Sequence, residues 1–208
     1  MAALVGYLAD LYMASGTSVA FTAEVMTDSG DHQTYNVAVG NTAHRYWDDK
    51  SALTIQTSPD GVTWTTVTTG FTVRYVGGQV TFTTVDATRE VRASGNYLPI
   101  SQVGQAYEWE VSPSANVIDV SVFGSAWKTK IVGLHDSTAK ASRYFLDGTF
   151  FNLLGSRFVV VFYVDFATNT RFEAYAWLKT TPEKVGVDAV IQEELDWEID
   201  GQLYYQAS

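Results

Sequence analysis

The stretch that decides the fold reads FTVRYVGGQVTFTTV (71–85), VRASGNYLP (91–99) and AYEWEVSPSANVIDVSVFGSAWKTK (106–130). Apolar and polar residues alternate in it, which is typical of strands whose successive side chains point to opposite faces of a sheet. The pair Gly77-Gly78 favours a tight hairpin turn, because glycine accepts positive φ. The stretch has many strand signals and few groups that could perform chemistry. It therefore predicts a β-rich protein that acts through its shape and through contacts with copies of itself.

The composition sets the size of the fold and excludes several classes of function. The 208 residues are 46% hydrophobic and 14% aromatic, which is enough for one sizeable β domain with a packed core. There is no cysteine, so disulfides and thiolate metal sites are excluded. With 13 Lys and Arg against 23 Asp and Glu, the formal net charge is −10. An acidic chain without a basic cluster is not expected to grip the phosphates of nucleic acid.

The sequence offers no candidate for a membrane segment. No run approaches the ~20 apolar residues that a membrane-spanning helix needs. The N-terminal MAALVGYLADLYMASG lacks a positively charged start and contains Asp10, so a signal peptide is not expected. We therefore expect a soluble protein made inside the cell, without a membrane partner.

Strands are expected along most of the chain, with one short helix among them. The only convincing helical pattern is STAKASRYFLD (137–147), where Ala141, Tyr144 and Phe145 fall at i, i+3 and i+4, and Gly148 follows as a stop signal. The next run, RFVVVFYVDF (157–166), is apolar on both faces, as expected of a central strand. We predict one antiparallel β-sandwich domain over residues 1–208, with a short packed helix near residues 137–147.

Residues 27–50 carry weaker strand signals and are expected to form a long loop. A long loop in a compact domain is more often functional than accidental. Two alternatives remain open for a cluster inside it: an exposed anchor for a neighbouring subunit, or a local cap in which the two aromatic residues close one end of the sandwich. The cluster consists of Tyr46, Trp47, Asp48 and Asp49.

The sharpest charge feature lies near the C-terminus, where carboxylates alternate with apolar residues. Since successive strand residues point to opposite faces, this spacing places four carboxylates on one side of a strand. Like charges this close are tolerated only on a wet face. The face is either the ordinary solvated side of a strand or an acidic surface that a polyanion passes without binding. The four residues are Glu194, Asp196, Glu198 and Asp200.

The groups that could carry chemistry form no recognisable constellation. The histidines, His32, His44 and His135, lack the spacing of metal ligands on a helix or strand. No nucleophile elbow, phosphate-binding glycine loop or Ser/His/Asp signature occurs. Glu108 and Glu110 could in principle flank a glycosidic bond, but two carboxylates at i and i+2 of a strand are more often a solvated face. We expect no enzyme activity, no cofactor and no metal site.

The order of the hairpin motifs resembles a known family. A pattern in the major tail tube proteins of long-tailed, siphovirus-like bacteriophages is similar to FTVRYVGGQVTF followed by VRASGNYLP. In that pattern a hairpin with a glycine turn leads to a strand that ends in a Ser-Gly-Tyr-like sequence, here residues 93–97. The segment in which these tail tube proteins change from sheet to their single packed helix resembles EWEV and VIDVSVFGSAWKTKIVGLHDSTAKASRYFLDG. ELDWEIDGQLYY resembles their closing strand, Asp-Gly turn and last aromatic strand. The resemblance spans residues 71–205 and rests on the combination and order of the motifs.

The resemblance implies a structural virion protein whose copies form hexameric rings stacked into a tail tube, a conduit for DNA during ejection. It implies inter-ring contacts through loops and the N-terminal arm, here Met1–Gly6 and the loop 27–50 with Tyr46, Trp47, Asp48 and Asp49. The implied channel is acidic, so Glu194, Asp196, Glu198 and Asp200 would face the lumen and DNA would pass without specific binding. The implied partners are other copies, the tape measure and the tail terminator. The implied location is the phage tail, after synthesis in the host bacterial cytoplasm.

Two alternatives to a tail tube protein remain. Another ring component of the tail, such as a terminator, connector or baseplate ring, would share the sandwich. A carbohydrate-binding β-sandwich module would instead expose Trp47, Trp64 or Trp109 to stack on sugar rings. Rings and filaments would indicate a tail component, whereas a monomer would indicate the binding module.

Overall fold

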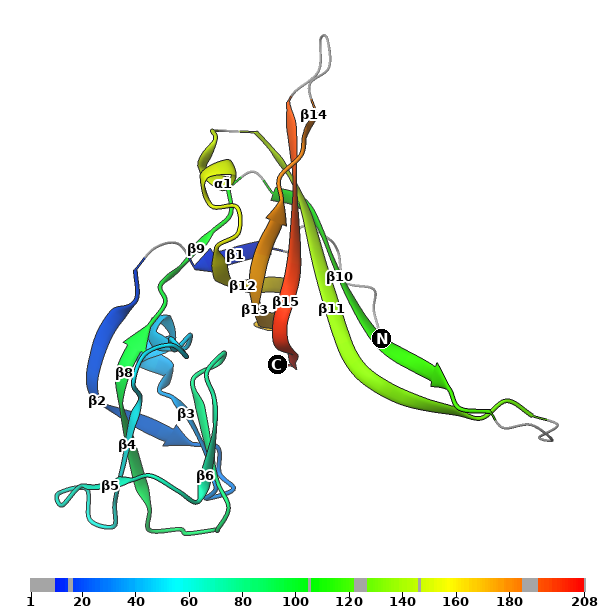
Figure 1. Ribbon diagram of the computed structural model, residues 1–208. Helices are drawn as coiled ribbons and strands as arrows, with labels where there is room; N and C mark the ends of the chain where they lie inside the picture. The colour runs from blue at the N-terminus through cyan, green and yellow to red at the C-terminus, as the bar shows by residue number, and fades with distance from the viewer. Residues whose placement is uncertain are drawn as a thin grey trace. The chain divides into compact units, whose positions relative to one another are not determined.

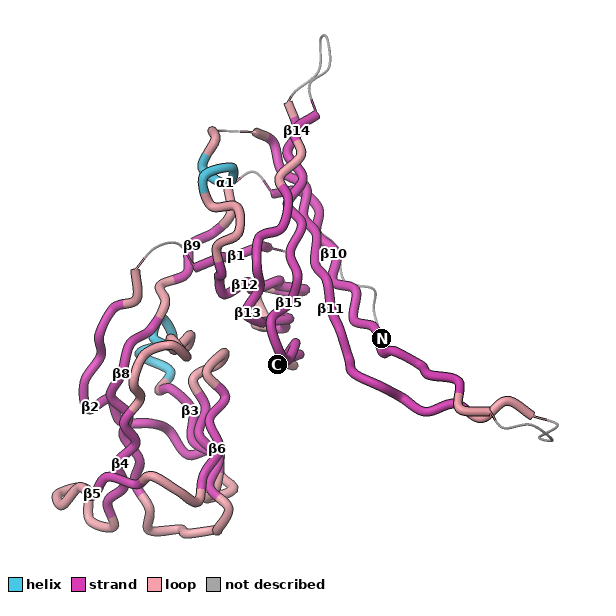
Figure 2. Tube along the Cα trace, viewed as in Figure 1, coloured by secondary structure: helices cyan, strands magenta, loops and turns pink. Residues whose placement is uncertain are grey.

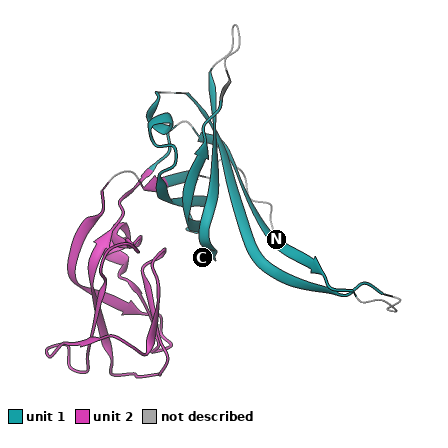
Figure 3. Cartoon of the chain, viewed as in Figure 1, with its two compact units in different colours: residues 1–12, 102–208 teal, residues 13–101 magenta. Residues whose placement is uncertain are grey.

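The computed structural model describes residues 10–14, 17–104, 106–121, 127–145, 147–184 and 191–207. The chain divides into two compact units, unit 1 with residues 1–12 and 102–208 and unit 2 with residues 13–101 (Figure 3). Strands dominate both units (Figure 2), so the predicted mainly β, antiparallel fold is confirmed. The prediction of a single domain over the whole chain stays a prediction. The N-terminal arm, residues 1–6, lies outside the described residues.

Unit 1 is built on one antiparallel sheet with the strand order β10-β11-β15-β13-β12-β1-β9, in which β14 also pairs with β15 (Figure 1). The central strand β12 is buried on both faces from Phe158 to Tyr163, as its apolar run predicts. The strands of this sheet are β1 (Asp10–Ala14), β9 (Ile100–Gln102), β10 (Ala106–Asp119), β11 (Lys130–Tyr144), β12 (Arg157–Asp165), β13 (Thr170–Thr180), β14 (Glu183–Lys184) and β15 (Gln192–Gln206). The border between the units runs through β1 and β9, whose residues 13–14 and 100–101 count with unit 2.

A large part of the core of unit 1 lies on the face of this sheet that carries Trp197. Trp197 of β15 lies opposite Ala139 of β11 and opposite Leu178 of β13, and all three side chains are buried. The ring of Phe162 lies 5.9 Å from that of Trp197 and 5.4 Å from that of Trp109. Close packing of large and small side chains across neighbouring strands therefore holds the sheet together.

The helix predicted near residues 137–147 is wrong. Residues up to Tyr144 belong to β11, where Ala139, Ala141 and Arg143 are buried and the residues between them are more exposed. Pairing with β10 on one side and β15 on the other imposes this period of two, so tertiary packing overrides the helical spacing. A single helical turn, α1 (Thr149–Asn152), follows instead.

A proline and a glycine lie inside strands of this sheet. Pro113 lies within β10, which ends the strand order of its sheet, and an edge strand tolerates a residue without an N–H. Gly201 lies within β15 with φ of 88°, where the register against β13 shifts. The Asp200-Gly201 step is therefore a bulge in a continuous strand, and the hairpin expected there is wrong.

Unit 2 is a second antiparallel sheet with the order β5-β4-β8-β2-β3-β7-β6. Strands from both halves of this order share one core that contains Phe21, Tyr35, Trp47 and Val91, so the sheet folds over itself as a sandwich. The hairpin predicted at Gly77-Gly78 joins β6 to β7. The strands are β2 (Val19–Asp28), β3 (Thr34–Val37), β4 (Thr54–Ser58), β5 (Thr65–Val67), β6 (Phe71–Arg74), β7 (Gln79–Phe82) and β8 (Glu90–Tyr97).

Residues 27–50 form a loop only in part. They contain the end of β2, all of β3 and a short 3-10 helix, η2 (Val39–His44). Within the described ranges, no helix has the length and apolar character needed to cross a membrane.

Candidate functional site

The acidic row lies on β15, in the middle of the sheet of unit 1. The four carboxylates share the face opposite Leu195 and Trp197, which are buried at 0% and 1% exposure. The alternation seen in the sequence therefore translates directly into one acidic strand face. Whether this face lines a lumen stays a prediction.

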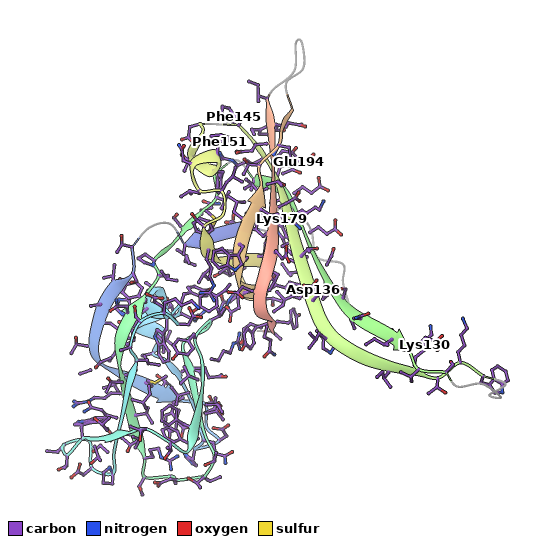
Figure 4. The ribbon with its side chains drawn as sticks, viewed as in Figure 1. Lys130, Asp136, Phe145, Phe151, Lys179 and Glu194 are labelled. Atoms are coloured by element: carbon purple, nitrogen blue, oxygen red, sulfur yellow. The ribbon has the colours of Figure 1, made fainter. Side chains whose placement is uncertain are left out.

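Cations from three neighbouring strands partly neutralise the row. Lys140 Nζ of β11 lies 3.4 Å from Asp196 Oδ1, and Lys179 Nζ of β13 lies 3.2 Å from Glu198 Oε2. Arg157 Nε of β12 donates to Asp200 Oδ2 at 2.5 Å. Figure 4 labels Lys179 and Glu194 of this face. Exposed pairs contribute about 0–1 kcal/mol each, so their main effect is to weaken the local negative potential. The sequence alone does not indicate these ion pairs, because the cations lie far from the carboxylates along the chain.

The same face continues onto β10. Glu108 lies opposite Ser142 and Glu110 opposite Lys140, and they border a hollow of about 180 Å³. The hollow is lined by Glu108, Trp109, Glu110, Lys140, Ala141, Ser142, Glu194 and Asp196. The described part of the chain has no group of three or more His, Asp or Glu residues placed to hold a metal ion. The arrangement is a charged surface.

The far part of β10 and β11 stands apart from the sheet. Within the described residues, β11 pairs with β15 only from Thr138 to Tyr144, whereas residues 130–137 pair with β10 alone. We call residues 112–121 and 127–137 the ribbon. It extends beyond the other strands of unit 1 (Figure 1), and Figure 4 shows Lys130 farther out along it than Asp136.

The ribbon exposes large apolar side chains on both faces. Val117 lies opposite Val132, and Ile118 lies opposite Ile131, so neighbouring pairs point to opposite faces. A two-stranded hairpin is marginally stable by itself in water, and contiguous exposed apolar surface marks an interaction site. The seven side chains, 40–86% exposed, are Val117, Ile118, Val120, Trp127, Ile131, Val132 and Leu134.

The aromatic pair in residues 27–50 does not form an exposed anchor. Tyr46 is 2% exposed and Trp47 is 1% exposed, and the Phe21 ring stacks on that of Trp47 at 5.9 Å. The anchor interpretation is therefore wrong for both residues, and their burial agrees with the local cap. Asp48 accepts hydrogen bonds from Lys50 N and Ser51 Oγ in the following turn. An inter-ring contact through Asp48 or Asp49 stays a prediction.

The three tryptophans suggested as sugar platforms all contact other side chains of the protein. Trp47 is in the core of unit 2, and the guanidinium of Arg92 lies 4.3 Å from the ring centre of Trp64. Trp109 packs against Phe162, and its indole N–H is buried. Trp47 therefore presents no open aromatic face for stacking on a sugar, whereas Trp64 and Trp109 are half-buried.

Two buried ion pairs in unit 1 could not be found from the sequence. Arg143 Nε donates to Glu193 Oε2 at 2.6 Å, and both side chains are nearly inaccessible. Arg171 Nε donates to Glu173 Oε2 at 2.7 Å, again in the interior. The first pair joins β11 to β15, so only strand register brings its two residues together.

The clearest displaced pKa belongs to a turn of unit 2. The carboxylate of Asp60 accepts the backbone N–H groups of Thr63 and Val62 at 2.8 and 2.9 Å, and the hydroxyl of Ser58 at 2.8 Å. These hydrogen bonds favour the ionised form and lower the pKa of Asp60 to about 2. The group stabilises the β4–β5 turn and touches no candidate ligand site.

Comparisons with known proteins give a partial similarity in fold. No protein-family model matches the sequence, and no curated protein matches it. The chain is similar to a chain from the virion of a native gene transfer agent particle, with a TM-score of 0.42 and 15% identity over 52% of this chain and 89% of that one. It is similar to a chain from the tail of an empty gene transfer agent particle of C6 symmetry, with a TM-score of 0.42 and 15% identity over 52% and 87%. A similarity of this size carries no information on function.

Proposed function

We propose that the chain is a structural protein of a phage tail, whose copies form hexameric rings stacked into the tail tube. The ribbon is the observation that carries this proposal. Among the residues that the structure describes, its distal strands pair only with each other, and they expose seven large apolar side chains on two faces. Such a ribbon gains stability only when another surface covers it. In a protein that acts by assembly, that surface belongs to another copy.

The sequence resemblance to tail tube proteins supports the tube as the form of this assembly. The resemblance spans residues 71–205, a range that includes the ribbon. Other tail proteins, the tape measure and the terminator, are the further partners that we propose. The location that follows is the phage tail.

The acidic face suits a conduit for DNA. Six carboxylates on β10 and β15 share it with Lys140, Lys179 and Arg157, which gives a formal charge of 3 − 6 = −3. A net negative, wet surface repels phosphates, so DNA would pass it without specific binding. We propose that Glu194, Asp196, Glu198 and Asp200 face the lumen, less strongly charged than the sequence alone indicates.

Negative-stain electron microscopy of the purified chain, combined with light scattering, tests the proposal. We expect sixfold rings and tubes whose length increases with protein concentration. Single rings that never stack would indicate a terminator, connector or baseplate ring instead. Monomers at every concentration would contradict self-assembly and would favour the carbohydrate-binding module instead.

A further inference from the structure

The chain leaves unit 1 and returns to it through two neighbouring strands. β1 and β9 lie side by side at the end of the strand order β12-β1-β9. Val103 N donates to the Leu11 carbonyl at 2.8 Å, and the side-chain amide of Gln102 donates to the carboxylate of Asp10 at 2.8 and 2.9 Å. The intervening residues are therefore an insertion between adjacent strands of one sheet.

The inserted residues form strands that pair with one another, and they have a hydrophobic core of their own. The strand order of unit 2 runs from β5 to β6 through members of the same unit alone, within the described residues. Its hydrophobic cluster is drawn from residues 21–97, with Val80 and Val91 fully buried in it. A segment whose strands pair with one another and which has a core of its own has what a domain needs to fold.

The apolar surface available for assembly differs between the two units. In the described part of unit 2, every exposed large hydrophobic residue is a valine, and these valines are spread over β2, η2 and loops. The ribbon of unit 1 instead concentrates seven such residues, including Trp127 and Leu134, on one two-stranded segment. Contiguous patches mark interaction sites, whereas single exposed hydrophobic residues are normal.

We infer that residues 13–101 are an inserted module that folds as a separate cooperative unit, and that self-association belongs to unit 1 alone. The second half of this inference rests on the proposed function. It is opposed to the assignment of residues 27–50 as an inter-ring element, because those residues lie inside the module. One set of full-length variants can decide between the two.

Calorimetry of the full chain tests the separate folding of the module. Ile55→Ala in unit 2 and Leu195→Ala in unit 1 are matched changes, because both side chains lie on strands at 2% and 0% exposure. We expect two thermal transitions, of which each variant lowers only one, by about 10 °C or more. A single transition that both variants lower together would overturn the inference.

A second variant tests the assignment of self-association to unit 1. Val91→Asp places a charge at a fully buried position of unit 2 and should unfold the module, which limited proteolysis would detect. We expect this variant to form tubes at a threshold concentration within about twofold of the wild-type value. Loss of tubes would overturn the assignment and favour residues 27–50 as an assembly element. If the wild-type chain forms no tubes, the proposed function is wrong, while calorimetry still decides whether the module folds separately.

Discussion

Substitution of Leu134 on the ribbon gives the sharpest test of self-assembly. Leu134 is 86% exposed, so Leu134→Asp removes almost no contact within the protomer. An exposed position of this kind typically changes the free energy of unfolding by about 0.5 kcal/mol or less. Circular dichroism and the thermal midpoint should therefore stay close to the wild-type values.

The effect on assembly should be much larger than the effect on folding. Complete burial of a leucine side chain contributes about 2 kcal/mol, and each 1.4 kcal/mol corresponds to about tenfold in affinity. If another copy covers Leu134, its loss raises the threshold concentration for tubes by about 30-fold. An ionised carboxylate in the apolar contact adds a desolvation cost, so this factor is a lower bound.

Light scattering over a concentration series, checked by electron microscopy, measures this threshold. Val62→Asp is the matched control, because Val62 is 81% exposed but lies in a turn of unit 2. We expect the control to assemble as the wild-type chain does. A change of less than about threefold for Leu134→Asp would refute the role of the ribbon, since it corresponds to less than about 0.7 kcal/mol.

Three further predictions concern the interior, a turn and the acidic face. Glu193→Ala removes the buried carboxylate that neutralises Arg143 and leaves the guanidinium only its longer contacts with Asp147, so it should cost about 3 kcal/mol in urea unfolding. The double change Arg143→Met with Glu193→Leu should cost much less, and equal losses would contradict this interpretation of the pair. Because the pKa of Asp60 lies near 2, below its usual 3.8, its contribution to stability is complete above about pH 4 and is lost as the pH falls through about 2. Asp60→Asn should make the fall of the unfolding midpoint over that range shallower, and an unchanged pH profile would show that the turn contributes nothing. The chain has no cysteine, so a single introduced cysteine can be labelled specifically. In assembled tubes a small maleimide should label both Val62→Cys and Glu198→Cys, whereas a bulky polymer maleimide should label only Val62→Cys. Equal labelling of the two variants by the bulky reagent would place Glu198 outside the lumen.

Patterns that depend on a single strand could be predicted from the sequence. The apolar run from Phe158 to Tyr163 predicts a strand buried on both faces, and the structure confirms it. The Gly77-Gly78 pair predicts the hairpin between β6 and β7, because positive φ at a tight turn is a local requirement. The alternation from Glu194 to Asp200 places its carboxylates on one face for the same reason.

Features that depend on pairing between distant segments could not be predicted. Residues 137–144 have a helical spacing of apolar side chains, but β10 and β15 on either side hold them in an extended strand. Tyr46 and Trp47 lie among polar residues in the sequence, yet they pack into the core of unit 2 or against its strands. The cations beside the acidic row come from β11, β12 and β13, which only the sheet order brings together.

The sequence by itself determined that this protein is a chain of strands, because alternation and glycine turns act over a few residues, and that its net charge is strongly negative. Only the tertiary structure decided how these strands are divided between two units, because β1 pairs with β9 although residues 15–99 separate the two strands along the chain, and residues 13–101 form the second unit. It also decided that β15 does not follow β11 along the far part of the β10–β11 pair, because its pairing with β11 ends at Thr138. That ribbon is the feature from which we propose assembly. Its starting point is determined by strand register, which is a property of the whole sheet.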